Sequence, residues 1–74
     1  TGTERVIGYL LKEAERDGEA VTLQASKAVV ASRLNVTPEH FSRILHDLTQ
    51  RGLIKVRGRV VTIPDLAKLR DNRK

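Results

Sequence analysis

Three polar side chains, Glu39, Ser42 and Arg43, have types and spacings suited to reading the edges of DNA bases. An arginine can donate two hydrogen bonds to guanine O6 and N7, and a glutamate can accept one from cytosine N4. On a helix, positions 39 and 43 lie on one face, so both side chains can reach the same groove. The alternative is an ordinary surface ion pair between Glu39 and Arg43, which would contribute only a few tenths of a kcal/mol.

A second group of basic residues, Lys55, Arg57 and Arg59, surrounds Gly58. Three cations beside a base-reading helix could neutralise backbone phosphates, which supply most of the sequence-independent affinity for DNA. Charged residues also stop small sheets from pairing edge to edge, so that structural role stays open as well. Ser26 and Lys27 combine the expected start of another helix with a cation, which suits either a phosphate contact or a plain helix cap.

The net charge is concentrated in the middle of the chain. Residues 26–63 carry seven basic and two acidic groups, whereas the rest of the chain carries seven of each. All of the formal net charge of +5 therefore lies in this block. A localised basic excess indicates a polyanionic partner, although a basic solvated surface without a partner is a comparable alternative before the motifs are considered.

Length and composition exclude several other classes of protein. The 74 residues are enough for one domain with a small core, so we expect a single domain over residues 1–74. The absence of cysteine excludes a disulfide scaffold, a thiolate zinc site and a cysteine nucleophile. There is no apolar run of ~20 residues and no signal peptide, so we expect a cytoplasmic protein with no membrane partner. The chain begins at Thr1 without methionine, and we expect it to be a fragment of a longer protein.

Enzymatic and metal-binding chemistry find no support in the sequence. His40 and His46 lie six residues apart, on different faces of any helix, so they cannot share a metal ion. The sequence has no glycine-rich phosphate loop, no HExxH motif and no recognisable Ser/His/Asp arrangement. We therefore expect no enzymatic activity, no metal and no cofactor in this domain.

The elements that must position these residues follow from caps and periodicity. Thr3 is the expected cap of the first helix and Gly18 its end, and Pro38 occupies the first turn of the third helix. Gly58 allows a tight turn between two strands, and Pro64 ends the second of them. The expected elements are helices over 3–17, 26–34, 37–51 and 65–70, an edge strand over 20–23 and a hairpin over 54–63, with a basic tail that frays.

The two middle helices are separated only by Asn35 and Val36, which predicts a helix-turn-helix arrangement. Asn35 tolerates the left-handed conformation that ends many helices, and Ala31 is small where the two helices must cross. The third helix is expected to bury one face, formed by Phe41, Ile44, Leu45 and Leu48, with Val36 as a further buried contact. The opposite face would carry Glu39, Arg43, His46 and Gln50. An ordinary helical hairpin is the alternative, but it leaves the following basic hairpin unexplained.

These features together resemble the C-terminal DNA-binding domain of the Crp/Fnr family of bacterial transcription regulators. The resemblance covers residues 5–69. It is carried by Thr22-Leu23, Ser26-Lys27-Ala28, the run from Ala31 to Glu39, Phe41-Ser42-Arg43-Ile44-Leu45, Gly52-Leu53-Ile54 and Gly58. It implies a mainly α fold with a small β-sheet (α+β), a winged helix-turn-helix with a three-helix core and a β-hairpin wing. The recognition helix would span 37–51 and the wing 55–59.

The resemblance also implies roles for single residues. Glu39, Ser42 and Arg43 match the Fnr branch, in which the arginine would read a guanine, the glutamate its neighbourhood and the serine a thymine of a TTGAT-like half-site. The cyclic-AMP branch has another arginine directly before the glutamate, and Pro38 at that position argues against its half-site. Residues that fall where family members touch phosphates are Ser26, Lys27, Thr37, His40 and Arg57.

The resemblance further implies binding partners, and domains that lie outside this sequence. Members of the family are homodimers that bind palindromic promoter sites and activate transcription by contact with RNA polymerase. They also have an N-terminal domain that binds the effector and a long dimerisation helix, both of which are absent from this sequence. The effector is therefore unknown, and we expect the fragment to be a monomer that binds double-stranded DNA on the nucleoid. The competing hypothesis is a winged-helix protein-interaction module, which would expose an apolar patch on the third helix.

Overall fold

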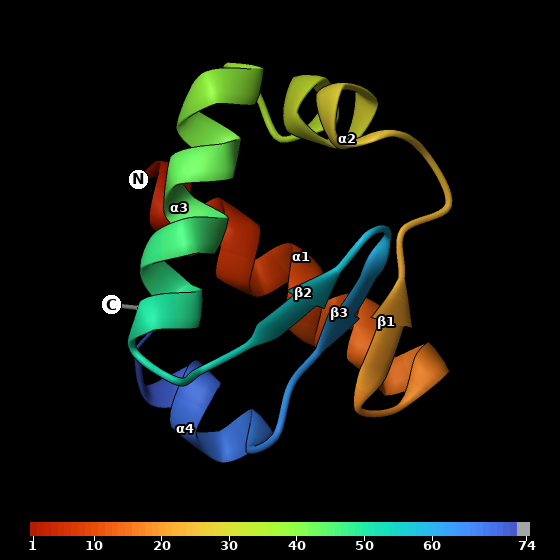
Figure 1. Ribbon diagram of the computed structural model, residues 1–74, viewed down its shortest axis with the longest axis vertical. Helices are drawn as coiled ribbons and strands as arrows, with labels where there is room; N and C mark the ends of the chain where they lie inside the picture. The colour runs from red at the N-terminus through yellow and green to blue at the C-terminus, as the bar shows by residue number, and fades with distance from the viewer. Residues whose placement is uncertain (73–74) are drawn as a thin grey trace.

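The computed structural model describes residues 1–72 and contains four helices and a three-stranded antiparallel sheet (Figure 1). The order along the chain is α1 (Gly2–Asp17), β1 (Ala20–Thr22), α2 (Lys27–Arg33), α3 (Pro38–Gln50), β2 (Lys55–Arg57), β3 (Val60–Thr62) and α4 (Leu66–Asp71). Every expected element is confirmed within one or two residues at its ends. The expected frayed tail falls largely on residues 73–74, which lie outside the described residues.

The start of α1 differs from the expectation. The cap is Thr1 and not Thr3, because the Thr1 hydroxyl accepts a hydrogen bond from the Glu4 backbone N–H at 3.3 Å. The Glu4 side chain reaches back to the Thr1 N-terminus at 3.5 Å, which completes a capping box. Threonine at 1 with glutamate at 4 has the spacing of this motif, whereas Thr3 is followed three residues later by Val6, which cannot make the reciprocal contact.

The turn between α2 and α3 has the predicted left-handed residue. Asn35 has φ 61°, the only positive φ among the non-glycine residues of the described chain. Backbone hydrogen bonds from Asn35 N–H to Ser32 and from Val36 N–H to Ala31 close the end of α2. Thr37 then caps α3, its hydroxyl accepting from the His40 N–H at 3.1 Å. The sharp turn sends α3 across α2, as Figure 1 shows at the top of the molecule.

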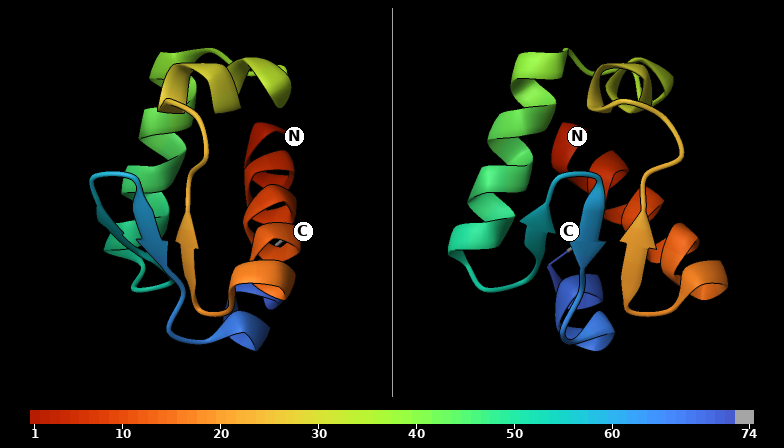
Figure 2. Two further views of the ribbon diagram at one scale, coloured as in Figure 1. Left: turned by 90° about the vertical axis from the view of Figure 1, so that its right-hand side faces the viewer. Right: turned by 45° about the vertical axis from the view of Figure 1, so that its right-hand side comes forward.

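The sheet has the order β1-β3-β2, so β1 is an edge strand as predicted. Arg57 pairs with Val60, which leaves Gly58 and Arg59 as a two-residue hairpin loop, and Gly58 has φ 56°. A glycine at the first loop position is what a type II′ turn requires. β2 contacts α3 and lies beside the C-terminal half of that helix in the right-hand view of Figure 2. It is therefore placed to act together with the exposed face of that helix.

One core joins all of these elements. α1 packs against β1, α3 and α4, and the largest fully buried side chain is Phe41 of α3. Ala31 is fully buried at the α2–α3 crossing, whereas Val36 is only half-buried, less than expected, and packs against the edge of the core. The predicted fold class is confirmed: a mainly α domain with a small sheet, built as a winged helix-turn-helix. No helix within residues 1–72 has both the length and the apolar composition needed to cross a bilayer.

Candidate nucleic-acid interface

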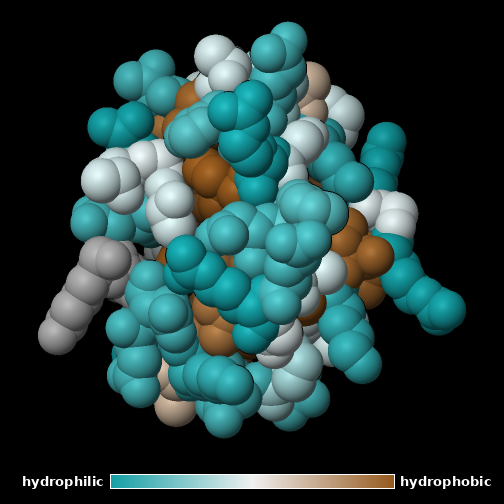
Figure 3. Space-filling model, turned by 60° about the vertical axis from the view of Figure 1, so that its left-hand side comes forward, coloured by the Kyte–Doolittle hydropathy of each residue, from teal (hydrophilic) through white to brown (hydrophobic). Residues whose placement is uncertain are grey.

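The two faces of α3 separate as the periodicity predicted. Phe41, Ile44, Leu45 and Leu48 are buried, and Glu39, Ser42, Arg43, His46 and Gln50 are exposed. In Figure 3, which turns α3 toward the viewer, hydrophilic residues cover most of the surface and the hydrophobic areas are small. Within residues 1–72 the exposed large hydrophobic side chains are Val29 on α2 and Val60 on β3, and neither lies on α3. The apolar patch expected of a protein-interaction module is therefore not found on this helix.

The structure does not form the Glu39–Arg43 ion pair that was the alternative to base reading. Among the described residues, ion pairs join Thr1 to Glu4, Arg16 to both Glu13 and Asp17, and Arg51 to Asp47. Arg43 has no acidic group within 4.0 Å in this part of the chain, and neither have the wing cations. The guanidinium of Arg43 is thus available to a ligand.

Two adjoining hollows lie between α3 and the wing. The first, of about 260 Å³, is lined by Lys27, Ser42, Leu45, His46, Thr49 and Val56. The second, of about 540 Å³, is lined by Thr49, Lys55, Val56, Arg57 and Thr62. Because Thr49 and Val56 line both, the two hollows are neighbours, and we call them together the α3–wing trough. Its charged lining is entirely basic.

Only some of the residues that were predicted to contact phosphates line the trough. Lys27 comes from the start of α2, and Lys55 and Arg57 come from the exposed side of β2, where they alternate with Val56. Arg59 lines neither hollow. It lies in the hairpin loop, and its carbonyl accepts a hydrogen bond from the Leu23 N–H at 2.8 Å. The Ser26 hydroxyl accepts from the Val29 N–H at 3.3 Å, so the predicted helix cap is confirmed.

Thr37 and His40 lie elsewhere, at the N-terminal end of α3. The His40 imidazole lies against α1, so close that a Cβ added at Gly2 would be 2.9 Å from its Nε2 atom. Glycine at position 2 is therefore what allows the two helix starts to approach. The predicted phosphate residues form two groups, one along the trough and one at the start of α3.

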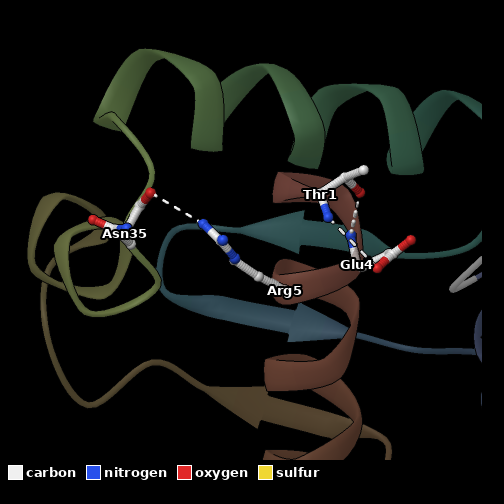
Figure 4. Close-up of polar contacts among 4 residues, drawn as sticks. All are labelled: Thr1, Glu4, Arg5 and Asn35. Atoms are coloured by element: carbon white, nitrogen blue, oxygen red, sulfur yellow. Dashed lines mark hydrogen bonds and ion pairs between the residues drawn. The ribbon is translucent and has the colours of Figure 1, made fainter.

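Two contacts near this surface were missed by the sequence reasoning. His46 lines the same hollow as Lys27, although 19 positions separate them along the chain. Arg5 of α1 donates a hydrogen bond from Nη1 to the Asn35 carbonyl at 3.4 Å (Figure 4). That bond ties the turn before α3 to the first helix. Neither contact has a signal in the local sequence, because each joins elements that only the tertiary fold brings together.

Other chemistry has little support at this surface. No group of three His, Asp or Glu side chains within residues 1–72 is arranged to bind a metal ion. Burial raises the pKa of Tyr9 on α1 above 10.0, Glu13 adds to the rise, and Arg33 and Arg16 oppose it. Tyr9 lines none of the hollows near α3.

Comparison with known proteins agrees with this geometry. The family model of the Crp-like helix-turn-helix domain matches residues 4–72. No curated protein sequence matches the chain. Among solved structures, DNR from Pseudomonas aeruginosa is 37% identical, with a TM-score of 0.83 over 95% of this chain and 32% of that protein. FixK2 from Bradyrhizobium japonicum is 27% identical, with a TM-score of 0.87 over 96% of this chain and 37% of that protein.

A third structure, a CooA mutant from Carboxydothermus hydrogenoformans, has a TM-score of 0.89 over the whole chain and 37% of its own length. At 21% identity it supports the fold alone. The chain thus spans about a third of the length of the solved proteins it resembles.

Proposed function

Since the chain belongs to the family of Crp-like helix-turn-helix domains, which bind DNA in transcription regulators, we propose that α3 reads a TTGAT-like half-site in the major groove. The observation that carries the proposal is the exposed Arg43 without an acidic partner in residues 1–72, on a helix beside a trough with only basic charges. An unpaired guanidinium does not have to break an ion pair before it binds guanine.

We assign base contacts to Glu39, Ser42 and Arg43. All three are exposed in the first half of α3, where a recognition helix reaches base edges. Arg43 would donate two hydrogen bonds to a guanine, Glu39 would contact the neighbouring position and Ser42 a thymine. The order of the three along the helix, together with Pro38, supports the Fnr-like half-site over the cyclic-AMP-receptor one.

We assign phosphate contacts to both ends of this surface. Lys27, Lys55 and Arg57 in the α3–wing trough and Arg59 at the hairpin loop would neutralise one stretch of DNA backbone. Ser26 lies beside Lys27 at the start of α2, and Thr37 and His40 lie at the start of α3, where a second stretch would pass. These contacts would position the domain on the duplex without reading its sequence.

In a longer parent protein we propose a homodimer on a palindromic promoter site, in contact with RNA polymerase, within the bacterial cytoplasm. Two domains bound to half-sites one helical turn apart would need a further element to fix their spacing. The 74-residue chain should accordingly sediment as a monomer and bind one half-site weakly. Analytical ultracentrifugation tests this, and a tight dimer at micromolar concentration would contradict it.

The sharpest test of base reading is Arg43→Ala. Selection from random-sequence duplexes by mobility shift first gives the preferred half-site. Anisotropy titrations then compare that site with one in which the single G·C pair is changed. An arginine–guanine fork supplies roughly 1–3 kcal/mol of discrimination, so the variant should lose about tenfold to a hundredfold on the preferred site only.

Arg51→Ala is the matched control on the same helix, because Arg51 is exposed, lies at the far end of α3 and is already paired with Asp47 at 3.2 Å. It should weaken both duplexes equally and slightly. Circular dichroism melts should show both variants folded, since exposed helical substitutions change stability little. If Arg43→Ala still distinguishes the two duplexes as the unaltered chain does, Arg43 does not read the base.

A further inference from the structure

His46 has no role in the function proposed above, yet it is exposed and lines the first hollow of the α3–wing trough. Its partners there come from three elements: Lys27 from α2, Ser42 one turn earlier on α3, and Val56 from β2. A histidine and a lysine from different helices thus share one depression.

The polar lining of this hollow is suited to an anion. Lys27 carries only N–H donors, and Ser42 and His46 can each donate a hydrogen bond. The Thr49 hydroxyl is already used, because it donates to the Leu45 carbonyl at 2.7 Å. No carboxylate lines the hollow. The nearest acidic residue in sequence, Asp47, is paired with Arg51.

The surroundings of the hollow favour a phosphate of a polymer over a small-molecule ligand. The hollow shares Thr49 and Val56 with the second one, which carries Lys55 and Arg57. One strand of DNA presents successive phosphates in a row, which could occupy both hollows, whereas a free anion would occupy only one binding site.

We propose that the first hollow binds one backbone phosphate of the DNA between the Lys27 ammonium and the His46 imidazole, and that DNA binding therefore takes up a proton at His46. The inference rests on the proposed function, in which α3 and the wing flank one stretch of duplex. Ser42 remains assigned to a base at the edge of the same hollow.

The charges around His46 set the direction of the effect. Lys27 faces the hollow from α2, Lys55 and Arg57 lie in the adjoining hollow on β2, and Arg43 and Asp47 neighbour His46 on α3. A phosphate brought among these cations adds a negative charge beside the imidazole, and an opposite charge within a few ångströms favours the protonated form. DNA binding should therefore strengthen as the pH falls through the range in which imidazole changes charge, about pH 5 to 8.

The test is the affinity of the whole chain for a half-site duplex across that pH range at constant ionic strength. The unaltered chain should bind about three- to tenfold more tightly at the acidic end, as expected when one charge-assisted hydrogen bond is added. His46→Gln should lose most of that pH dependence while keeping its preference for the half-site. Lys27→Gln should weaken binding at every pH and should reduce the effect of the His46 substitution when the two are combined.

His40→Gln separates the two histidines of α3, because His40 lies against Gly2, away from the trough, in the second group of proposed phosphate contacts. Any pH dependence that it removes should add to that removed by His46→Gln and should not change when Lys27→Gln is also present. A His46→Gln variant that retains the full pH dependence would overturn the inference. If the unaltered chain binds no duplex at any pH, the proposed function fails. Binding that is specific but independent of pH refutes only the role of His46.

Discussion

The two sides of this domain carry their charges in different ways. On the α1 side, basic and acidic residues alternate along the helix, and Arg16 lies between Glu13 and Asp17, with which it pairs. On the side formed by α2, α3 and the wing, one ion pair is present among the described residues, Asp47–Arg51, and it lies at the end of α3 away from the base-reading positions. The basic residues of the trough have no acidic partner within 4.0 Å there.

This difference shows why the total charge is a poor guide to where a partner binds. The chain has 14 basic and 9 acidic groups, but seven of the basic groups lie outside residues 26–63, together with seven of the acidic groups. Exposed ion pairs contribute little to stability, typically up to ~1 kcal/mol, so pairing matters mainly because it cancels the local field. An unpaired row of cations attracts DNA phosphates over a distance set by the salt concentration.

The largest expected effect tests whether the α1 side serves stability alone. Leu10 is fully buried on α1, and Leu10→Ala should lower the free energy of unfolding by about 2–5 kcal/mol. Thermal melts followed by circular dichroism measure the decrease. At a temperature where the variant remains folded, its affinity and preferred half-site should equal those of the unaltered chain. A changed preference in the folded variant would show that α1 also takes part in DNA reading.

The comparison between the two charged surfaces is tested by two triple variants. Replacing Lys55, Arg57 and Arg59 with alanine should weaken binding to all duplexes alike and flatten the plot of log K against log salt. The slope should fall by about 0.9 for each phosphate that the variant no longer neutralises. The matched variant replaces Lys12, Lys68 and Arg70, which are exposed on α1 and α4.

That control removes the same charge but should change the slope much less. Equal effects from both triple variants would mean that only net charge matters and that the trough has no special role. A wing variant that prefers a different sequence would mean that the wing reads bases.

A smaller effect concerns the turn that orients α3. Asn35 adopts φ 61°, a conformation that costs most residues roughly 1–2 kcal/mol but is free to glycine. Asn35→Gly should leave stability within about 1 kcal/mol of the original, whereas Asn35→Ala should destabilise by about 1 kcal/mol. Urea unfolding measures both. An alanine variant as stable as the glycine variant would show that the turn can adopt another conformation.

The smallest effect is the pH dependence due to Tyr9. Because burial raises its pKa above 10.0, the neutral phenol is favoured in the folded state. The stability it contributes is complete below pH 10.0, where neither state ionises, and is lost as the pH rises through the folded pKa. Tyr9→Phe should therefore lose less stability than the unaltered chain on going to high pH. Parallel pH dependences in urea unfolding of the two proteins would contradict this.

Much of the fold was determined by the sequence alone. The caps at Ser26 and Thr37, the left-handed Asn35, the buried face of α3 and the turn at Gly58 were all predicted and are confirmed. Each depends on interactions within about four residues of the chain, or on a helical period that repeats over such distances. The error at Thr3 was of the same local kind, because the capping box at Thr1 and Glu4 is visible in the sequence.

The tertiary structure decided what local signals could not. Whether Lys27 and His46 share a hollow and whether Arg5 reaches Asn35 depend on where the helices cross. The roles of Glu39, Ser42 and Arg43 as base contacts stay predictions, because base reading depends on a partner as well as on the fold. The sequence determined which side chains could bind DNA. The packing of α3 against α2 and the wing decided which of them meet, because residues far apart in the chain come together only around the shared core.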